Sequence, residues 1–187
     1  MAGVVAFALA AGGIAAGLLI PAVGAIPHNI IGAGHLTIEV NHGLGSDLSI
    51  ENLAPGESRT ADQLVTADMA GVGAADLAMT LSGAVPGPFT DNAWMTVSVS
   101  VPVSESDAHW ADGRCAPAGG FADAATYPVL AALHDPQTLP LGSLTDSHDA
   151  VCVRFEIGLA ASADNSVQAA TGGFAMDYTL SQTLASP

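Results

Sequence analysis

The densest group of side chains that could do chemistry lies in one short segment, between Glu105 and Asp112. Asp107, His109 and Asp112 offer carboxylate and imidazole groups, which are ligands for hard or borderline cations. A cation held there could activate a water molecule. One hypothesis is therefore a metal-dependent hydrolase that uses this segment, and the competing interpretation of the same residues is a solvated polar loop.

A second, similar group consists of Asp146, His148 and Asp149. A solvated loop is again the simpler interpretation of these residues. The two groups could converge if a disulfide drew the segment that carries Cys115 toward Cys152.

Cys115 and Cys152 are the two cysteines of the chain. An even number of cysteines behind an export-type leader predicts one disulfide, because disulfides persist outside the cytoplasm. The bridge would close a loop of about 37 residues, worth on the order of 3 to 4 kcal/mol in the chain-entropy model.

The sequence contains no GxSxG, HExxH or glycine-rich phosphate-binding motif. We therefore predict no catalytic residues and no bound cofactor. A net charge of −15, with three arginines and no lysine, also argues against nucleic acid as a partner, because nucleic acid is recognised through cationic patches.

Alternating apolar and polar residues dominate from residue 35 onward, which is typical of half-buried strands. The expected strands are 35–40, 47–50, 75–81, 94–103, 151–159 and 174–180. Pro55 and Gly56 predict a turn, and residues 104–120 predict a long loop. The alanine-rich segment 122–133 could hold one short helix, which Pro128 allows only if the helix starts near it.

Short strands separated by turn signals predict a mainly β fold, an antiparallel β-sandwich. In its strand Cys152 alternates with Val151 and Val153, which should face the core, so Cys152 should point away from it. The disulfide would then tie the loop that carries Cys115 onto the outer face of a sheet.

Residues 1–25 form an uncharged leader, and Gly3 to Pro21 is apolar throughout. That is about the ~20 residues a helix needs to cross a membrane. No positive residue precedes the apolar run, which is also longer than that of a usual secretory signal. We expect a retained transmembrane helix, although Val23-Gly24-Ala25 would suit a signal peptidase. A linker (26–34) and an extracytoplasmic β-sandwich domain (35–187) would follow.

Three segments resemble the camelysin and TasA-like family of bacterial envelope proteins. The first is the small-residue stretch and strand at 31–38, and the second is Leu48-Ser49-Ile50-Glu51-Asn52-Leu53-Ala54-Pro55-Gly56-Glu57-Ser58. The third is the closing run from Val153 through Asn165 and Gln168 to Gln182. The resemblance implies a jelly-roll-like sandwich that is secreted or envelope-bound, some members forming fibres by donating an N-terminal strand to a neighbour.

Our main functional expectation is a non-catalytic accessory or structural subunit of a larger bacterial membrane complex, with a single-pass anchor. Gly12, Gly13 and Gly17 would form the helix face that packs on an integral membrane partner. Absent lysine and abundant alanine are typical of GC-rich bacteria, and a respiratory cytochrome supercomplex is the specific expectation. The alternative is a TasA-like fibre subunit whose partners are copies of itself.

Overall fold

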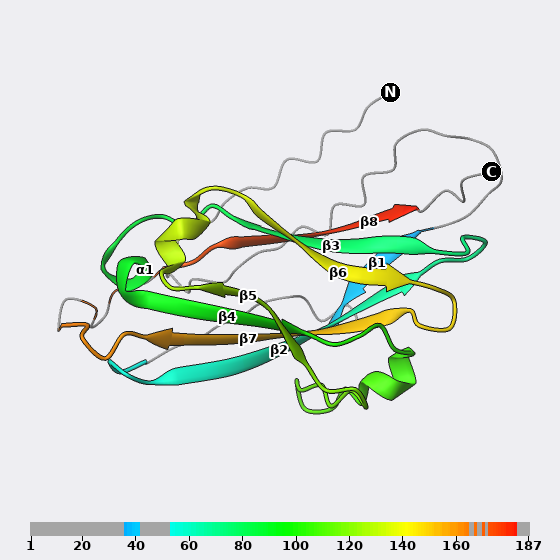
Figure 1. The fold of residues 1–187 in the computed structure, drawn as a ribbon, viewed down its shortest axis with the longest axis horizontal. Coiled ribbons are helices and arrows are strands. Elements are labelled where there is room, and N and C mark those ends of the chain that lie inside the picture. The colour runs from blue at the N-terminus through cyan, green and yellow to red at the C-terminus, as the bar shows by residue number, and fades with distance from the viewer. Residues whose placement is uncertain (1–35, 42–52, 165–166, 168–169, 171, 183–187) are drawn as a thin grey trace, which may run out of the picture.

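The computed structural model describes residues 36–41, 53–164, 167, 170 and 172–182. They form a five-stranded antiparallel sheet in the order β1-β2-β7-β4-β5 and a three-stranded antiparallel sheet in the order β6-β3-β8. Figure 1 shows the two sheets as two layers. The strands are β1 Thr37–Val40, β2 Ser58–Asp68, β3 Ala75–Ser82, β4 Ala93–Val99, β5 Ala122–Tyr127, β6 Gln137–Leu144, β7 Ala150–Leu159 and β8 Ala175–Gln182. The helices are α1 Pro88–Asn92 and two 3₁₀ helices, Glu105–Ala108 and Leu130–His134.

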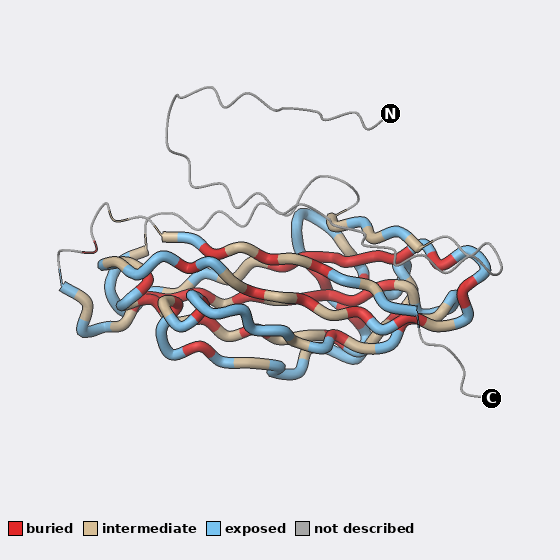
Figure 2. Tube along the Cα trace, turned by 90° about the horizontal axis from the view of Figure 1, so that it is seen from above, coloured by how far each residue is buried: buried red, intermediate tan, exposed pale blue. Residues whose placement is uncertain are grey.

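The main hydrophobic core lies between the two layers, where Figure 2 shows the buried stretches of the chain. Alternation builds it, because every second side chain of a strand faces the same way. Leu77 and Met79 of β3 enter it from one sheet, and Val153 and Phe155 of β7 enter it from the other. The prediction of a mainly β fold with antiparallel sheets packed as a sandwich is confirmed.

Strands β1, β3, β7 and β8 lie close to their predicted positions, and the predicted inward face of β7 is buried throughout. The predicted turn before β2 is also present. Gly56 has φ of +83° there, in the left-handed region that glycine adopts without the penalty of a Cβ atom.

The short helix expected within 122–133 is confined to the end of that segment, after Pro128. Residues Ala122–Tyr127 form β5, which pairs with β4, and only Leu130–His134 is helical. Alanine has the highest helix propensity of the amino acids, but tertiary context overrides propensity, and here pairing with the edge of the sheet outweighs it. Pro128 separates the two elements, because proline fixes φ and cannot donate a backbone hydrogen bond.

The strand predicted at 94–103 is too long. β4 ends at Val99, and Val101 is 63% exposed although the alternation predicts that it points the same way as Val97. Ser100 N still donates to Cys152 O of β7 at 2.9 Å, but Pro102 has no N–H for the ladder. The next pairing with β7 is an isolated bridge between Val103 and Ala150. The regular ladder therefore ends at Val99, and the chain leaves the sheet after Val103.

The sequence pattern missed β2 and β6. Residues 62–67 of β2 are buried without alternation, because side chains on both faces of this strand are covered. β6 contains Pro140 and Gly142, which would argue against a central strand. It is an edge strand with a register shift opposite Leu77 and Ala78, where proline and bulges are tolerated.

The predicted anchor (1–25), the linker (26–34) and the strand at 47–50 lie outside the described residues. Within the part of the chain that the structure describes, no helix has the length and hydropathy to cross a membrane.

Candidate functional site

The three predicted metal ligands lie in the excursion between β4 and β5, residues 104–120, which we call the flap. Asp107 belongs to the 3₁₀ helix Glu105–Ala108, and its carboxylate accepts a hydrogen bond of 2.7 Å from Ser104 Oγ. His109 and Asp112 follow at positive φ, and all three side chains are exposed. Among the described residues, no group of three or more His, Cys, Asp or Glu side chains could hold a metal ion. The geometry therefore lends no support to a metal-dependent hydrolase.

The second polar group forms the turn between β6 and β7. Thr145 and His148 exchange backbone hydrogen bonds of 3.0 and 3.1 Å, and Asp149 Oδ1 accepts one of 3.0 Å from the Glu105 backbone N–H. The two polar groups do meet, through Asp149 and the start of the flap helix. The contact fixes the loops against each other.

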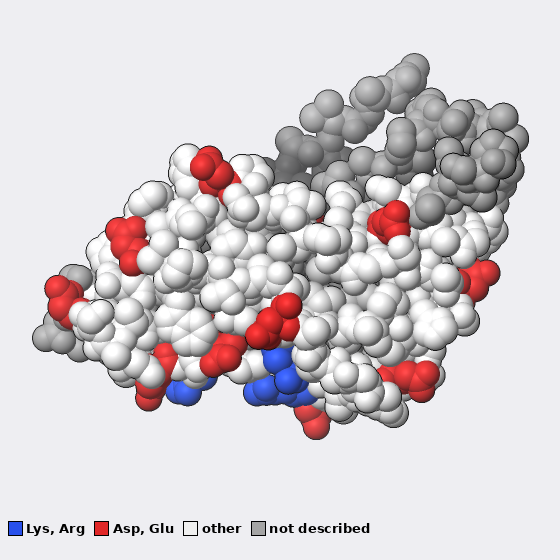
Figure 3. Space-filling view, viewed as in Figure 1, with Lys and Arg blue, Asp and Glu red and all other residues white. Residues whose placement is uncertain are grey.

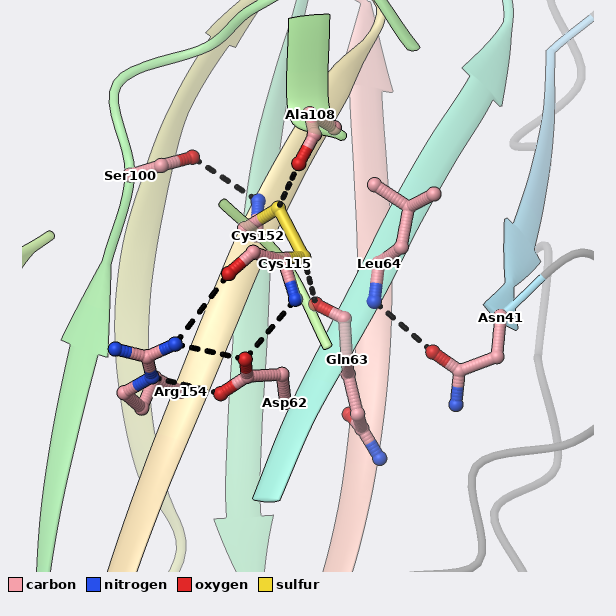
Figure 4. The surroundings of a disulfide bond; sticks show 9 residues. All are labelled: Asn41, Asp62, Gln63, Leu64, Ser100, Ala108, Cys115, Cys152 and Arg154. Atoms are coloured by element: carbon pink, nitrogen blue, oxygen red, sulfur yellow. Dashed lines mark hydrogen bonds and ion pairs between the residues drawn. A yellow bond between two sulfur atoms is a disulfide. The ribbon is translucent and has the colours of Figure 1, made fainter. Parts of the chain in front are cut away.

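The predicted disulfide between Cys115 and Cys152 is present, with 6.2 Å between the Cα atoms (Figure 4). Cys152 points to the outer face of the five-stranded sheet, away from the main core, as predicted. It is fully buried nevertheless, because the flap covers it. A second apolar cluster, the outer cluster, forms beneath the flap from Leu64, Val103, Ala108, Cys115, Ala150 and Cys152.

A charged clasp stands beside the disulfide. Arg154 of β7 donates from Nε and Nη2 to the two carboxylate oxygens of Asp62 at 2.7 and 2.8 Å, and Cys115 N donates to Asp62 Oδ2 at 3.0 Å (Figure 4). The Arg154 guanidinium also lies 4.0 Å from the centre of the Phe121 ring, a favourable cation–π position. The hydrogen bond to Asp62 raises the pKa of Arg154. One carboxylate thus joins two strands and the flap.

Sequence reasoning missed Asp62 because it missed β2. A signal was available in Arg154, one of only three cations in the chain. It lies in a strongly apolar strand on the same face as Cys152, and a cation at such a position needs a partner.

An acidic pocket of about 450 Å³ lies on the outer face of the five-stranded sheet, at the ends of β1 and β2. Its carboxylates come from both strands, from the flap and from the β6–β7 turn. They are Glu39, Asp68, Glu105, Asp146 and Asp149. No single segment of the sequence shows more than two of them, so this pocket was not predicted.

Gly12, Gly13 and Gly17, the predicted helix-packing face, lie outside the described residues. Comparison of the chain with protein-family models, with curated proteins and with solved structures finds no match.

Proposed function

We propose that the chain is an exported, membrane-anchored accessory subunit whose β-sandwich stands outside the cytoplasm and docks on a larger membrane complex. The observation that carries the proposal is the disulfide between Cys115 and Cys152, built into the buried outer cluster. Such bridges form and persist in oxidising compartments and are rare in the cytosol.

The distribution of charge supports a protein partner. Figure 3 shows acidic side chains spread over one face, with basic ones only along its lower edge. Of the three arginines, Arg154 is held by Asp62 and Arg59 lies 3.7 Å from Glu57. A surface of this kind repels nucleic acid and anionic lipid and favours cationic protein surfaces.

The anchor and the complex belong to the proposal. The apolar run of residues 3–21 supplies a single span, and an integral membrane complex is the expected partner. A respiratory cytochrome supercomplex is our specific choice, with no catalytic role and no cofactor assigned to this chain.

The test is purification of a C-terminally tagged chain from its native membrane in mild detergent, followed by intact mass and identification of co-purifying proteins. Full-length mass with stoichiometric membrane partners is expected. A signal peptidase would remove a leader of about 25 residues. A mass that is short by that amount, with no co-purifying partners, would contradict the proposal.

A matched pair of variants tests the glycine face. On a helix with 100° per residue, Gly13 and Gly17 share one side and Ala15 lies nearly opposite. Gly13→Leu should reduce co-purification of the partner by about tenfold, since close helix approach requires small residues. Ala15→Leu should leave it unchanged, and equal effects of the two variants would contradict packing through this face.

One observation favours the alternative of a TasA-like fibre subunit with the jelly-roll-like arrangement that the resemblance implies. β1 pairs with β2 over only four residues, from Thr37 opposite Asp68 to Val40 opposite Val65. The pairing ends where the Asn41 side chain accepts a hydrogen bond of 2.9 Å from Leu64 N. So short an edge strand could be exchanged between copies at little cost, by the same strand addition that many assemblies use.

An engineered disulfide between β1 and β2 distinguishes the fibre subunit from the anchored subunit. Ile38 and Ala67 are register partners in β1 and β2, so Ile38→Cys with Ala67→Cys would lock β1 into its own sheet. Fibres seen by electron microscopy for wild type and Ile38→Cys, and lost only in the oxidised double variant, would favour strand exchange. If wild type, Ile38→Cys and the oxidised double variant all fail to form fibres, the result would contradict the fibre subunit and favour the anchored subunit.

A further inference from the structure

The floor of the acidic pocket is built by facing side chains of two paired strands. Thr37 lies opposite Asp68 and Glu39 lies opposite Thr66. Their neighbours Ile38 and Ala67 pack in or against the main core, so these four side chains share the outer face of the sheet. The flap and the β6–β7 turn supply the wall through Glu105, Asp146 and Asp149.

The side chain of Thr66 distinguishes this pocket from an ordinary acidic surface. Its side chain is more than nine-tenths buried, at 9% exposed, and it lines the pocket. Its hydroxyl has no hydrogen-bond partner in the part of the chain that the structure describes. Every fully enclosed side-chain oxygen or nitrogen in that part has a partner, so the Thr66 hydroxyl is reached from the pocket. A buried hydroxyl left open to a pocket offers a ligand both a donor and an acceptor.

The carboxylates of the pocket are not grouped as a metal site. No group of three acidic, His or Cys residues among those described could hold a metal ion, whereas a calcium ion needs six to eight oxygens at about 2.3–2.6 Å. None of the lining side chains is a cation. The pocket therefore suits several positive charges that are spaced apart, each meeting its own carboxylate.

A second copy of this chain is a poor source of those charges. The chain has three arginines and no lysine, and two of the arginines lie beside carboxylates of their own fold. Two copies that each carry a net charge of −15 also repel each other. The cations must come from another molecule.

We propose that the acidic pocket receives an arginine-bearing segment of a partner protein. A guanidinium is planar and carries five N–H donors, so it can bind a carboxylate and the Thr66 hydroxyl at the same time, which an ammonium group does less well. The inference deepens the proposed function and rests on it for the partner being a protein.

The probe is a fluorescein-labelled octapeptide of alternating glycine and arginine, titrated with the purified full-length chain in detergent at physiological salt. The pocket variant is Glu39→Gln with Asp68→Asn and Asp146→Asn, and the control variant is Asp91→Asn with Asp112→Asn and Asp135→Asn. The three control residues are exposed and lie outside the pocket, and both variants lose three negative charges. Thr66→Val, the glycine–lysine octapeptide and spermidine complete the set.

The pocket variant should weaken binding by about tenfold or more and the control variant by about twofold or less, because carboxylates that contact the bound peptide contribute more than distant ones, whose attraction salt screens. Thr66→Val should weaken it by about tenfold, the size expected for one hydrogen bond to a charged group, and the arginine peptide should bind more tightly than the lysine peptide.

Equal losses in the two triple variants would overturn the proposal in favour of diffuse attraction. Unchanged binding by Thr66→Val would overturn the role of the pocket floor, and spermidine that binds more tightly than the arginine peptide would replace the protein segment with a small polyamine. The titration uses no membrane partner. If the chain binds the arginine peptide but no membrane partners co-purify with it, only the proposal of an anchored subunit is contradicted. If partners co-purify but the peptide does not bind, only the proposal for the acidic pocket is contradicted.

Discussion

Asp62 links three segments of the outer face. Its side chain is fully buried, and its two carboxylate oxygens receive hydrogen bonds from Arg154 and from the Cys115 backbone N–H. Arg154 remains about one third exposed, so the pair is only partly desolvated. The carboxylate is therefore stabilised by charge and by hydrogen bonds together, at a point that links β2, β7 and the flap.

Asp62→Asn keeps the size and one acceptor oxygen but removes the charge. We expect it to lower the free energy of unfolding by about 2 kcal/mol, the range for hydrogen bonds to a charged group. Glu57→Gln removes the same charge from the exposed pair with Arg59 and should change stability by about 0.5 kcal/mol or less. Urea unfolding at pH 7 measures both, and equal losses would mean that the clasp is no stronger than a surface pair.

Tyr178 gives the molecule a predictable response to alkali. It is buried in the main core, its hydroxyl donates to Gln63 Oε1, and burial raises its pKa above the ordinary value of 10.0. Burial also raises the pKa of Tyr127. Because the folded state holds these protons more tightly than the unfolded state, their stabilisation is complete below pH 10 and is lost as the pH rises above it.

The free energy of unfolding should therefore fall above pH 10 by up to about 1.4 kcal/mol per pH unit for each buried tyrosine. The chain has no lysine, so few other side chains titrate in this range. Tyr178→Phe should make the fall shallower, while costing about 1 kcal/mol at pH 7 for the lost hydrogen bond. Denaturant titrations between pH 8 and 11 measure it, and an unchanged slope in the variant would refute this assignment.

Among the elements, the flap is the one whose position depends on a covalent bond. It has no strand of the main sheets, and its buried side chains enter only the small outer cluster. The main core contains none of its residues. The sandwich and the flap are therefore held by different sets of contacts.

Replacing both cysteines by alanine should lower the free energy of unfolding by about 3 to 4 kcal/mol, the chain-entropy value for a separation of 37 residues. Amide hydrogen exchange should rise first in residues 104–120, while β3 and β7 keep their protection, because local opening follows local contacts. Wild type fully reduced in denaturant should refold to the stability of the variant. A uniform loss of protection over all strands would show that the sandwich itself depends on the bridge.

At the scale of the whole molecule, unbalanced charge opposes folding. Eighteen acidic residues face three arginines, so the compact state gathers like charges that salt can screen. Raising NaCl from 0.01 to 0.15 M at pH 7 should increase stability by about 1 kcal/mol, or about 3 °C in Tm for a domain of this size. At pH 4.2, near the isoelectric point, the same change should have almost no effect. A salt response of equal size at both values would exclude self-repulsion as its cause.

Prediction from sequence succeeded where one face of a strand is buried and the other is not. Val153 and Phe155 show this in β7, as Leu77 and Met79 do in β3. It failed at Leu64, because covering the outer face of β2 removes the alternation. It failed also at Ala125, where local preference for a helix gave way to pairing with Val97. When a segment distant in the sequence buries the outer face of a strand, the local sequence shows no alternation that would predict the strand.

The sequence alone determined the β class, the pairing of Cys115 with Cys152 and the direction in which Cys152 points, because two-residue alternation and a count of two cysteines are local facts. Only the tertiary structure decided the clasp and the acidic pocket. Asp62 and Arg154 are 92 residues apart, and the pocket joins strands near residues 39 and 66 to turns near 105 and 146. Such contacts arise from strand order and register, which depend on how the whole core packs and not on any one segment.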